Sequence, residues 1–238
     1  VLCSMNPTSV VLPARYLHVA CGAATVALAG LIAERLRRGA GIPAALLAAF
    51  SPTLLGTSRL IYTDTVMTTF ALAALERMLA WHERGGKVRL AAAVGLIGLA
   101  AGAKYPGAVV LIPLAWLLWD RAHGRGLILW LVAGVGAAAI FLLTTPYALL
   151  DFAALKRDIA LHGLHVAGGH LGQPTTGAPA FYLGRLLHDL GPVGLALLVV
   201  SAASCVACRP GRARSLAVWL FLLAFIVPMA VARYALAY

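Results

Sequence analysis

The polar stretch from Thr57 to Asp64 holds the side chains best suited to chemistry, because it interrupts two long apolar runs. Arg59 and Asp64 lie five residues apart within it. Charged residues are costly inside a membrane, and those that occur there often mark a functional site. We therefore predict that Asp64 faces a polar cavity at the non-cytoplasmic surface of a membrane. The alternative is that Asp64 only caps the following helix, whose dipole favours a carboxylate.

Lys104 and Tyr105 form a second candidate group, in the short sequence Gly102-Ala-Lys-Tyr-Pro-Gly107 between two apolar runs. So short a connection holds the lysine at the membrane surface, where a lipid phosphate could bind. The alternative is snorkelling, in which lysine and tyrosine at helix ends only reach the membrane interface.

Histidines form a third group, in the long polar segment that ends at Asp189. Asp158, His162 and His165 would share one face of a helix, and His170 follows in Gly-His-Leu-Gly. Zinc could bind two histidines and a carboxylate, but this spacing matches no known short metal motif. We predict a polar, acceptor-binding surface and no metal ligands, and the sequence leaves a divalent-metal requirement open.

The composition places the whole chain in a bilayer. Hydrophobic residues make up 62% of it, charged residues only 11%, and the mean hydropathy is +0.91. The net charge of +11 comes from short basic clusters between apolar runs, and not from one continuous face of the kind that binds nucleic acid.

We predict an all-α, polytopic bundle that forms one domain, residues 1–238, truncated at both ends, with a long extracytoplasmic loop at 146–190. The third span is the least secure, because it contains Glu76 and Arg77; its alternative is an amphipathic helix on the cytoplasmic surface. The predicted spans, about eight in number, are Tyr16–Ala33, Gly41–Leu55, Thr65–Trp81, Leu90–Ala103, Gly107–Trp119, Leu127–Thr145, Gly191–Cys208 and Ser215–Ala232.

Basic clusters fall on alternate connections, after the first, third, fifth and seventh predicted spans. The positive-inside rule makes that side cytoplasmic. Asp64, Lys104, Asp151 and Arg233 then share the other side, where they could line one cavity. Cations together with carboxylates suit a phosphate-bearing substrate and a nucleophile that must lose a proton.

Several motifs resemble the polytopic glycosyltransferases of the C superfold. They are Ser58–Phe70 with its arginine and aspartate, Gly98–Pro113 with its Gly-x-x-x-Gly-x-Lys-Tyr pattern, Thr145–Asp151, the spaced histidines, and Arg233-Tyr234. Together they are similar to the dolichyl-phosphate-mannose protein mannosyltransferase family, glycosyltransferase family 39, and its bacterial lipid A- and polysaccharide-modifying relatives.

The resemblance implies inverting transfer of a sugar from a polyprenyl-phosphate carrier to a protein, lipid or glycan acceptor. The protein would be a multi-pass protein of the bacterial inner membrane with its active site facing outward. Asp64 matches a second acidic position that organises the cavity, and Lys104 would bind the donor phosphate. The remaining residues predicted to bind substrate are Arg59, Tyr105, Asp151, His162, His165, His170, Arg233 and Tyr234.

The family's principal acidic residue, thought to be the base, lies in a loop that precedes the segment matching Tyr16–Ala33. We therefore expect these 238 residues to lack it and to be inactive alone. Two rival functions remain: a transporter or lipid-linked sugar flippase, which would carry its charges near the bilayer midplane, and a noncatalytic membrane assembly subunit.

Overall fold

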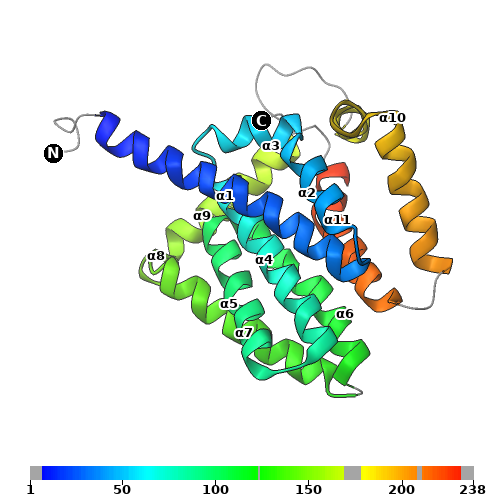
Figure 1. Cartoon of the computed structure of the whole chain (residues 1–238). Coiled ribbons are helices and arrows are strands. Elements are labelled where there is room, and N and C mark those ends of the chain that lie inside the picture. Colours follow the sequence, from blue (N-terminus) through cyan, green and yellow to red (C-terminus); the bar gives the residue numbers. More distant parts are fainter. Residues whose placement is uncertain (1–6, 123, 169–177, 208–210, 232–238) are drawn as a thin grey trace.

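The computed structural model describes residues 7–122, 124–168, 178–207 and 211–231, and the regular structure in these ranges is helical (Figure 1). The elements are α1 (Pro7–Leu36), α2 (Gly41–Ala49), α3 (Pro52–Ser58), α4 (Thr63–Arg84), α5 (Lys87–Ala103), the 3-10 helix η2 (Tyr105–Val110), α6 (Leu111–Ala122), α7 (Gly126–Thr144), α8 (Tyr147–Leu150), α9 (Phe152–Gly168), α10 (Ala178–Ala207) and α11 (Arg212–Val231).

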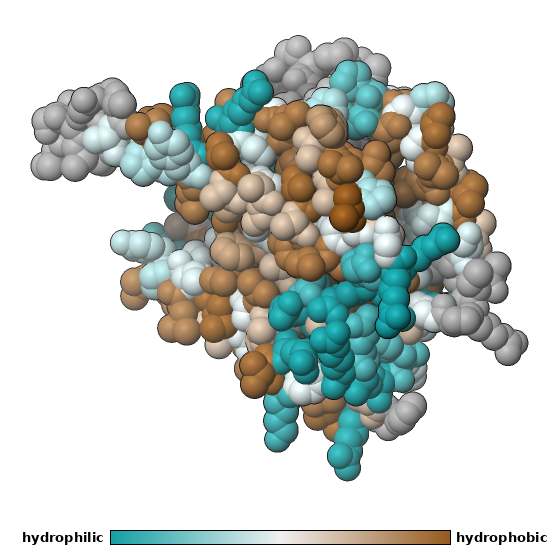
Figure 2. All heavy atoms as spheres, viewed as in Figure 1, coloured by the Kyte–Doolittle hydropathy of each residue, from teal (hydrophilic) through white to brown (hydrophobic). Residues whose placement is uncertain are grey.

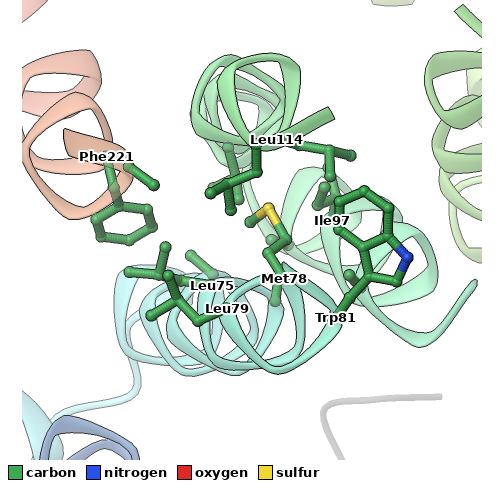
Figure 3. Packing of buried hydrophobic residues seen from close by; sticks show 14 of the residues in the cluster. Leu75, Met78, Leu79, Trp81, Ile97, Leu114 and Phe221 are labelled. Carbon is green, nitrogen blue, oxygen red and sulfur yellow. The ribbon is translucent and has the colours of Figure 1, made fainter. Parts of the chain in front are cut away.

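Helix α4 is the centre of the bundle. Its residues Leu75, Met78 and Leu79 are fully buried, and Ile97 of α5 and Phe221 of α11 lie against them (Figure 3). Helices α1, α5, α6 and α11 all pack on α4. The alternative of an amphipathic surface helix for the third predicted span is therefore wrong, because this helix carries the core.

Helices α4 and α5 form an antiparallel hairpin (Figure 1). Gly85 and Gly86 make its tight turn with φ values of +69° and +95°, which other residues rarely adopt. The 22 residues of α4 span about 33 Å, close to the thickness of a bilayer core. The hairpin consequently brings the start of α4 and the end of α5 to the same end of the bundle.

The prediction of about eight membrane spans is not confirmed. Within the described ranges three helical stretches are long and apolar enough to cross a membrane, Val11–Leu36, Gly126–Thr144 and Leu186–Ser204. A fourth crossing is possible if α2 and α3, which meet at 62°, act as one broken span. Helices α5 and α6 are too short, with 17 and 12 residues.

Most of the described part of the predicted loop at 146–190 is helical. It contains α8, α9 and the first part of α10, which breaks at Gly191 (φ +66°) before Pro192. The hydroxyl of Thr53 on α3 donates a hydrogen bond to Asp189 of α10. Apolar residues recur along this segment and favour a water-poor environment. Backbone N–H and C=O groups there need partners within the chain, and helices supply them.

The basic clusters lie at one end of the bundle, here called the basic end and marked by Arg35, Arg121 and Arg214. Arg214 Nη1 donates to the carbonyl oxygen of Arg35 at 3.0 Å, which joins the first and last clusters. Arg121 donates to the carbonyl oxygen of His82, which joins the second and third. Figure 2 shows hydrophilic side chains gathered in one patch in the lower part of the view, bordered by hydrophobic surface. Asp64, at the start of α4, lies at the opposite end.

The buried carboxylate of Glu76 explains how α4 tolerates charge. Only 2% of its side chain is exposed, and Arg35 of α1 donates to it from Nη2 at 2.6 Å. Arg77 also pairs with Glu76, while Arg35 and Arg214 both pair with Glu83. The network joins α1, α4 and α11, so each buried carboxylate has a cationic partner.

Candidate active site

Asp64 and Lys104 form a bidentate ion pair. Lys104 Nζ lies 2.7 Å from Oδ1 and 2.9 Å from Oδ2 of Asp64. The pair is open to the surroundings, since 38% of the Asp64 side chain and 20% of the Lys104 side chain are exposed. Two residues predicted separately from the sequence therefore form one charged site, at the end of the bundle opposite the basic clusters.

The backbone around Lys104 directs its side chain. Lys104 is the single residue between α5 and η2, and its backbone is extended, with φ of −160° and ψ of 132°. Its carbonyl oxygen accepts a hydrogen bond from the Gly107 N–H at 2.8 Å. A Cβ on Gly107 would collide with the backbone of Ala100, so only glycine lets η2 fold back onto α5.

Asp64 occupies the first turn of α4, and Tyr62 is the N-cap residue. The capping alternative for Asp64 is therefore not what the structure shows, because its two oxygens accept hydrogen bonds from Lys104. The Tyr62 carbonyl oxygen accepts from the Thr65 N–H at 3.1 Å and lies 3.0 Å from His18 Nε2. His18 Nδ1 lies 2.7 Å from the carbonyl oxygen of Ala14.

His18 was not among the residues predicted for the site. It is 5% exposed and links α1 to the turn that precedes Asp64. Its presence in an apolar run was a usable signal, but nothing in the local sequence indicates that its partner is Tyr62. Thr25 and Thr69 were missed in the same way: their hydroxyls, 3.0 Å apart and buried, join α1 to α4.

For three other predicted residues, no contact with the Asp64–Lys104 pair is seen in the described part of the chain. Tyr105 follows Lys104, is 41% exposed, and its ring meets Phe141 edge-on at 6.2 Å. Arg59 is exposed at the end of α3. Asp151 is exposed and caps α9, since its Oδ1 accepts from the Ala154 N–H at 2.9 Å.

The remaining predicted residues cannot be placed as side chains. His162 and His165 belong to α9, whose helical backbone gives them and Asp158 the expected spacing, but their side chains lie outside the described part. His170, Arg233 and Tyr234 lie outside the described residues altogether. Among the described side chains, no group of three or more histidines, cysteines or carboxylates could hold a metal ion.

Two pockets lie at the basic end, away from the ion pair. The larger, of about 850 Å³, is lined by His82, Trp116 and Asp120 among others. The smaller, of about 590 Å³, lies beside Arg35 and Arg214. The Asp64–Lys104 pair lines neither of these two pockets.

A family model described as dolichyl-phosphate-mannose-protein mannosyltransferase matches residues 8–149. The chain belongs to this family. No curated protein and no solved structure matches it. Membership makes this chain a membrane glycosyltransferase of the mannosyltransferase kind, in agreement with its apolar helices and with the resemblance seen in the sequence. The match includes Asp64 and Lys104 and ends before Asp151 and before the predicted His162, His165 and His170.

Proposed function

We propose that this mannosyltransferase-family protein transfers a sugar from a polyprenyl-phosphate carrier to an acceptor on the non-cytoplasmic face of the membrane, with inversion at the sugar carbon. The observation that carries the proposal is the Asp64–Lys104 pair. Asp64 holds the partly exposed ammonium group of Lys104 at the end of the α4–α5 hairpin, where the phosphate headgroup of a membrane carrier would lie.

The pair assigns different roles to its two members. An ammonium group supplies three hydrogen-bond donors and can stabilise the negative charge that grows on a departing lipid phosphate. Asp64 accepts from the same ammonium through both oxygens, so it holds Lys104 in position instead of taking the acceptor's proton. The base that deprotonates the acceptor hydroxyl is a separate group in this proposal.

The position of the pair favours an enzyme over a transporter. A transporter binds its cargo near the bilayer midplane. Asp64 instead lies in the first turn of α4, at the end of the bundle. The buried carboxylate of Glu76 is instead paired with Arg35, which lies at the basic end with 18% of its side chain exposed, and this suits a structural role.

The test is transfer of radiolabelled sugar from a polyprenyl-phosphate donor in vesicles that contain the full-length protein. We expect Asp64→Asn and Lys104→Ala to lose transfer while the protein still inserts. The matched control is Asp120→Asn, which breaks the 2.8 Å His82–Asp120 pair at the basic end and should leave transfer intact. Unchanged turnover in both site variants would remove the pair from the active site.

A further inference from the structure

The smaller pocket at the basic end has an excess of positive charge. Four arginines line it, Arg35, Arg38, Arg84 and Arg214, against two glutamates, Glu34 and Glu83. The larger pocket contains Arg212 and Arg214 with Glu83 and Asp120, so its formal charges cancel when His82 is neutral. Of the two, only the smaller pocket attracts an anion by its net charge.

The inner wall of the smaller pocket is fixed by internal ion pairs. Glu83 binds both Arg35, at 2.7 Å, and Arg214. Glu34 is turned toward the backbone, where the N–H groups of Gly39 and Gly41 donate to its Oε2 at 2.9 and 3.0 Å. The two glutamates are thus already engaged.

Arg38 and Arg84 supply the positive charge at the rim. Both are exposed, and no salt bridge or side-chain hydrogen bond holds either guanidinium within the described part of the chain. They come from the connection after α1 and from the end of α4, on two sides of the pocket. Guanidinium groups match the oxygens of a phosphate through paired hydrogen bonds.

Apolar surface adjoins the same pocket and indicates which anion it faces. Leu31 and Leu36 of α1 contribute to the lining. Helix α2 packs beside α1 and exposes Ile42 and Leu47, at 76% and 77%, as a lipid-facing surface would. A ligand seated here has its charged part near the arginines and its apolar part along the helices.

We propose that this pocket, between α1, α4 and α11, binds the phosphate headgroup of an anionic phospholipid. Arg38 and Arg84 contact the phosphate, and an acyl chain runs along Leu31. Basic pockets between membrane helices bind lipid headgroups in this way. The site is independent of the sugar-transfer proposal, because it lies at the other end of the bundle.

The test is lipid binding by the purified full-length protein, measured by native mass spectrometry and by thermal shift with phosphatidylglycerol or phosphatidylcholine. We expect preferential retention of phosphatidylglycerol. Arg38→Ala together with Arg84→Ala should weaken that retention about twenty-five-fold, since each interfacial arginine contributes roughly a fivefold attraction.

The matched control is Lys87→Ala together with Arg125→Ala, which removes two exposed cations outside the pocket, one at the start of α5 and one just before α7. This control should keep the preference for phosphatidylglycerol. Equal losses in both double variants, or equal retention of the two lipids, would overturn the proposal. An equal thermal shift with inorganic phosphate alone would assign the pocket to a soluble phosphate compound and would also refute lipid binding.

Discussion

Exchanging the charges of Asp64 and Lys104 separates a structural role of the pair from a functional one. The double variant Asp64→Lys, Lys104→Asp keeps one cation and one carboxylate at the same end of the α4–α5 hairpin. It moves the cation from the end of α5 to the first turn of α4. A pair needed only for folding is restored by this exchange, and a pair that must present a cation at position 104 is not.

The structure indicates small costs for stability. With 38% and 20% of the two side chains exposed, the pair contributes about 1 kcal/mol or less to the free energy of unfolding. A lysine in the first turn of α4 faces the positive end of the helix dipole, which costs about 0.3–1 kcal/mol. The exchanged protein should therefore fold, with a loss of roughly 1–2 kcal/mol at most.

The expected cost for transfer is larger. A hydrogen bond to a charged group contributes about 1.5–3 kcal/mol, which corresponds to roughly a tenfold to 150-fold loss in turnover when the cation is misplaced. The assay measures sugar transfer and, by denaturation in detergent, the stability of the two single variants and the exchanged double variant. Recovery of full turnover in the double variant would show that the pair only supports the fold, and would refute the assignment of Lys104 to the donor phosphate.

Two further predictions concern contacts that only the folded protein reveals. Arg35→Ala removes the α1 partner of the 2%-exposed carboxylate of Glu76, which keeps Arg77, and should destabilise the protein by about 1–3 kcal/mol. Arg35→Ala with Glu76→Leu should be milder, because no buried carboxylate is then left. Denaturation in detergent measures both, and equal losses would contradict the buried-pair account. His18→Leu removes the contact with the Tyr62 carbonyl and should lower the free energy of unfolding by about 1 kcal/mol. It should lower kcat more than donor affinity, because the turn before Asp64 loses its support. Unchanged kcat in a folded variant would exclude a positioning role for His18.

The meeting of Asp64 with Lys104 could be anticipated because it depends on local signals. Each residue lies at the boundary of an apolar run, and alternate basic clusters place both boundaries on one side of the membrane. A hairpin of two such runs, joined by Gly85 and Gly86, then brings those boundaries to one end. The sequence could not show that the lysine would bind both oxygens of the carboxylate, because that depends on how α4 and α5 pack.

Other predicted residues have partners that the sequence did not indicate. Asp151 carries the same charge as Asp64, yet it caps α9, because it stands immediately before that helix and its carboxylate can reach the Ala154 N–H. Glu76 and Arg77 made the third predicted span the least secure and left a surface helix as its alternative. The segment is instead the core of the bundle, because Arg35, distant in sequence, supplies the compensating charge.

The sequence by itself determined that the chain is helical, apolar and charged in alternating clusters, because hydropathy and positive-inside patterning are properties of neighbouring residues. Tertiary structure decided the contacts themselves: Lys104 with both oxygens of Asp64, Arg35 with Glu76, and His18 with the Tyr62 carbonyl oxygen. Such contacts depend on the packing of helices over distances of a few ångströms, and residue order does not encode these distances in any local pattern.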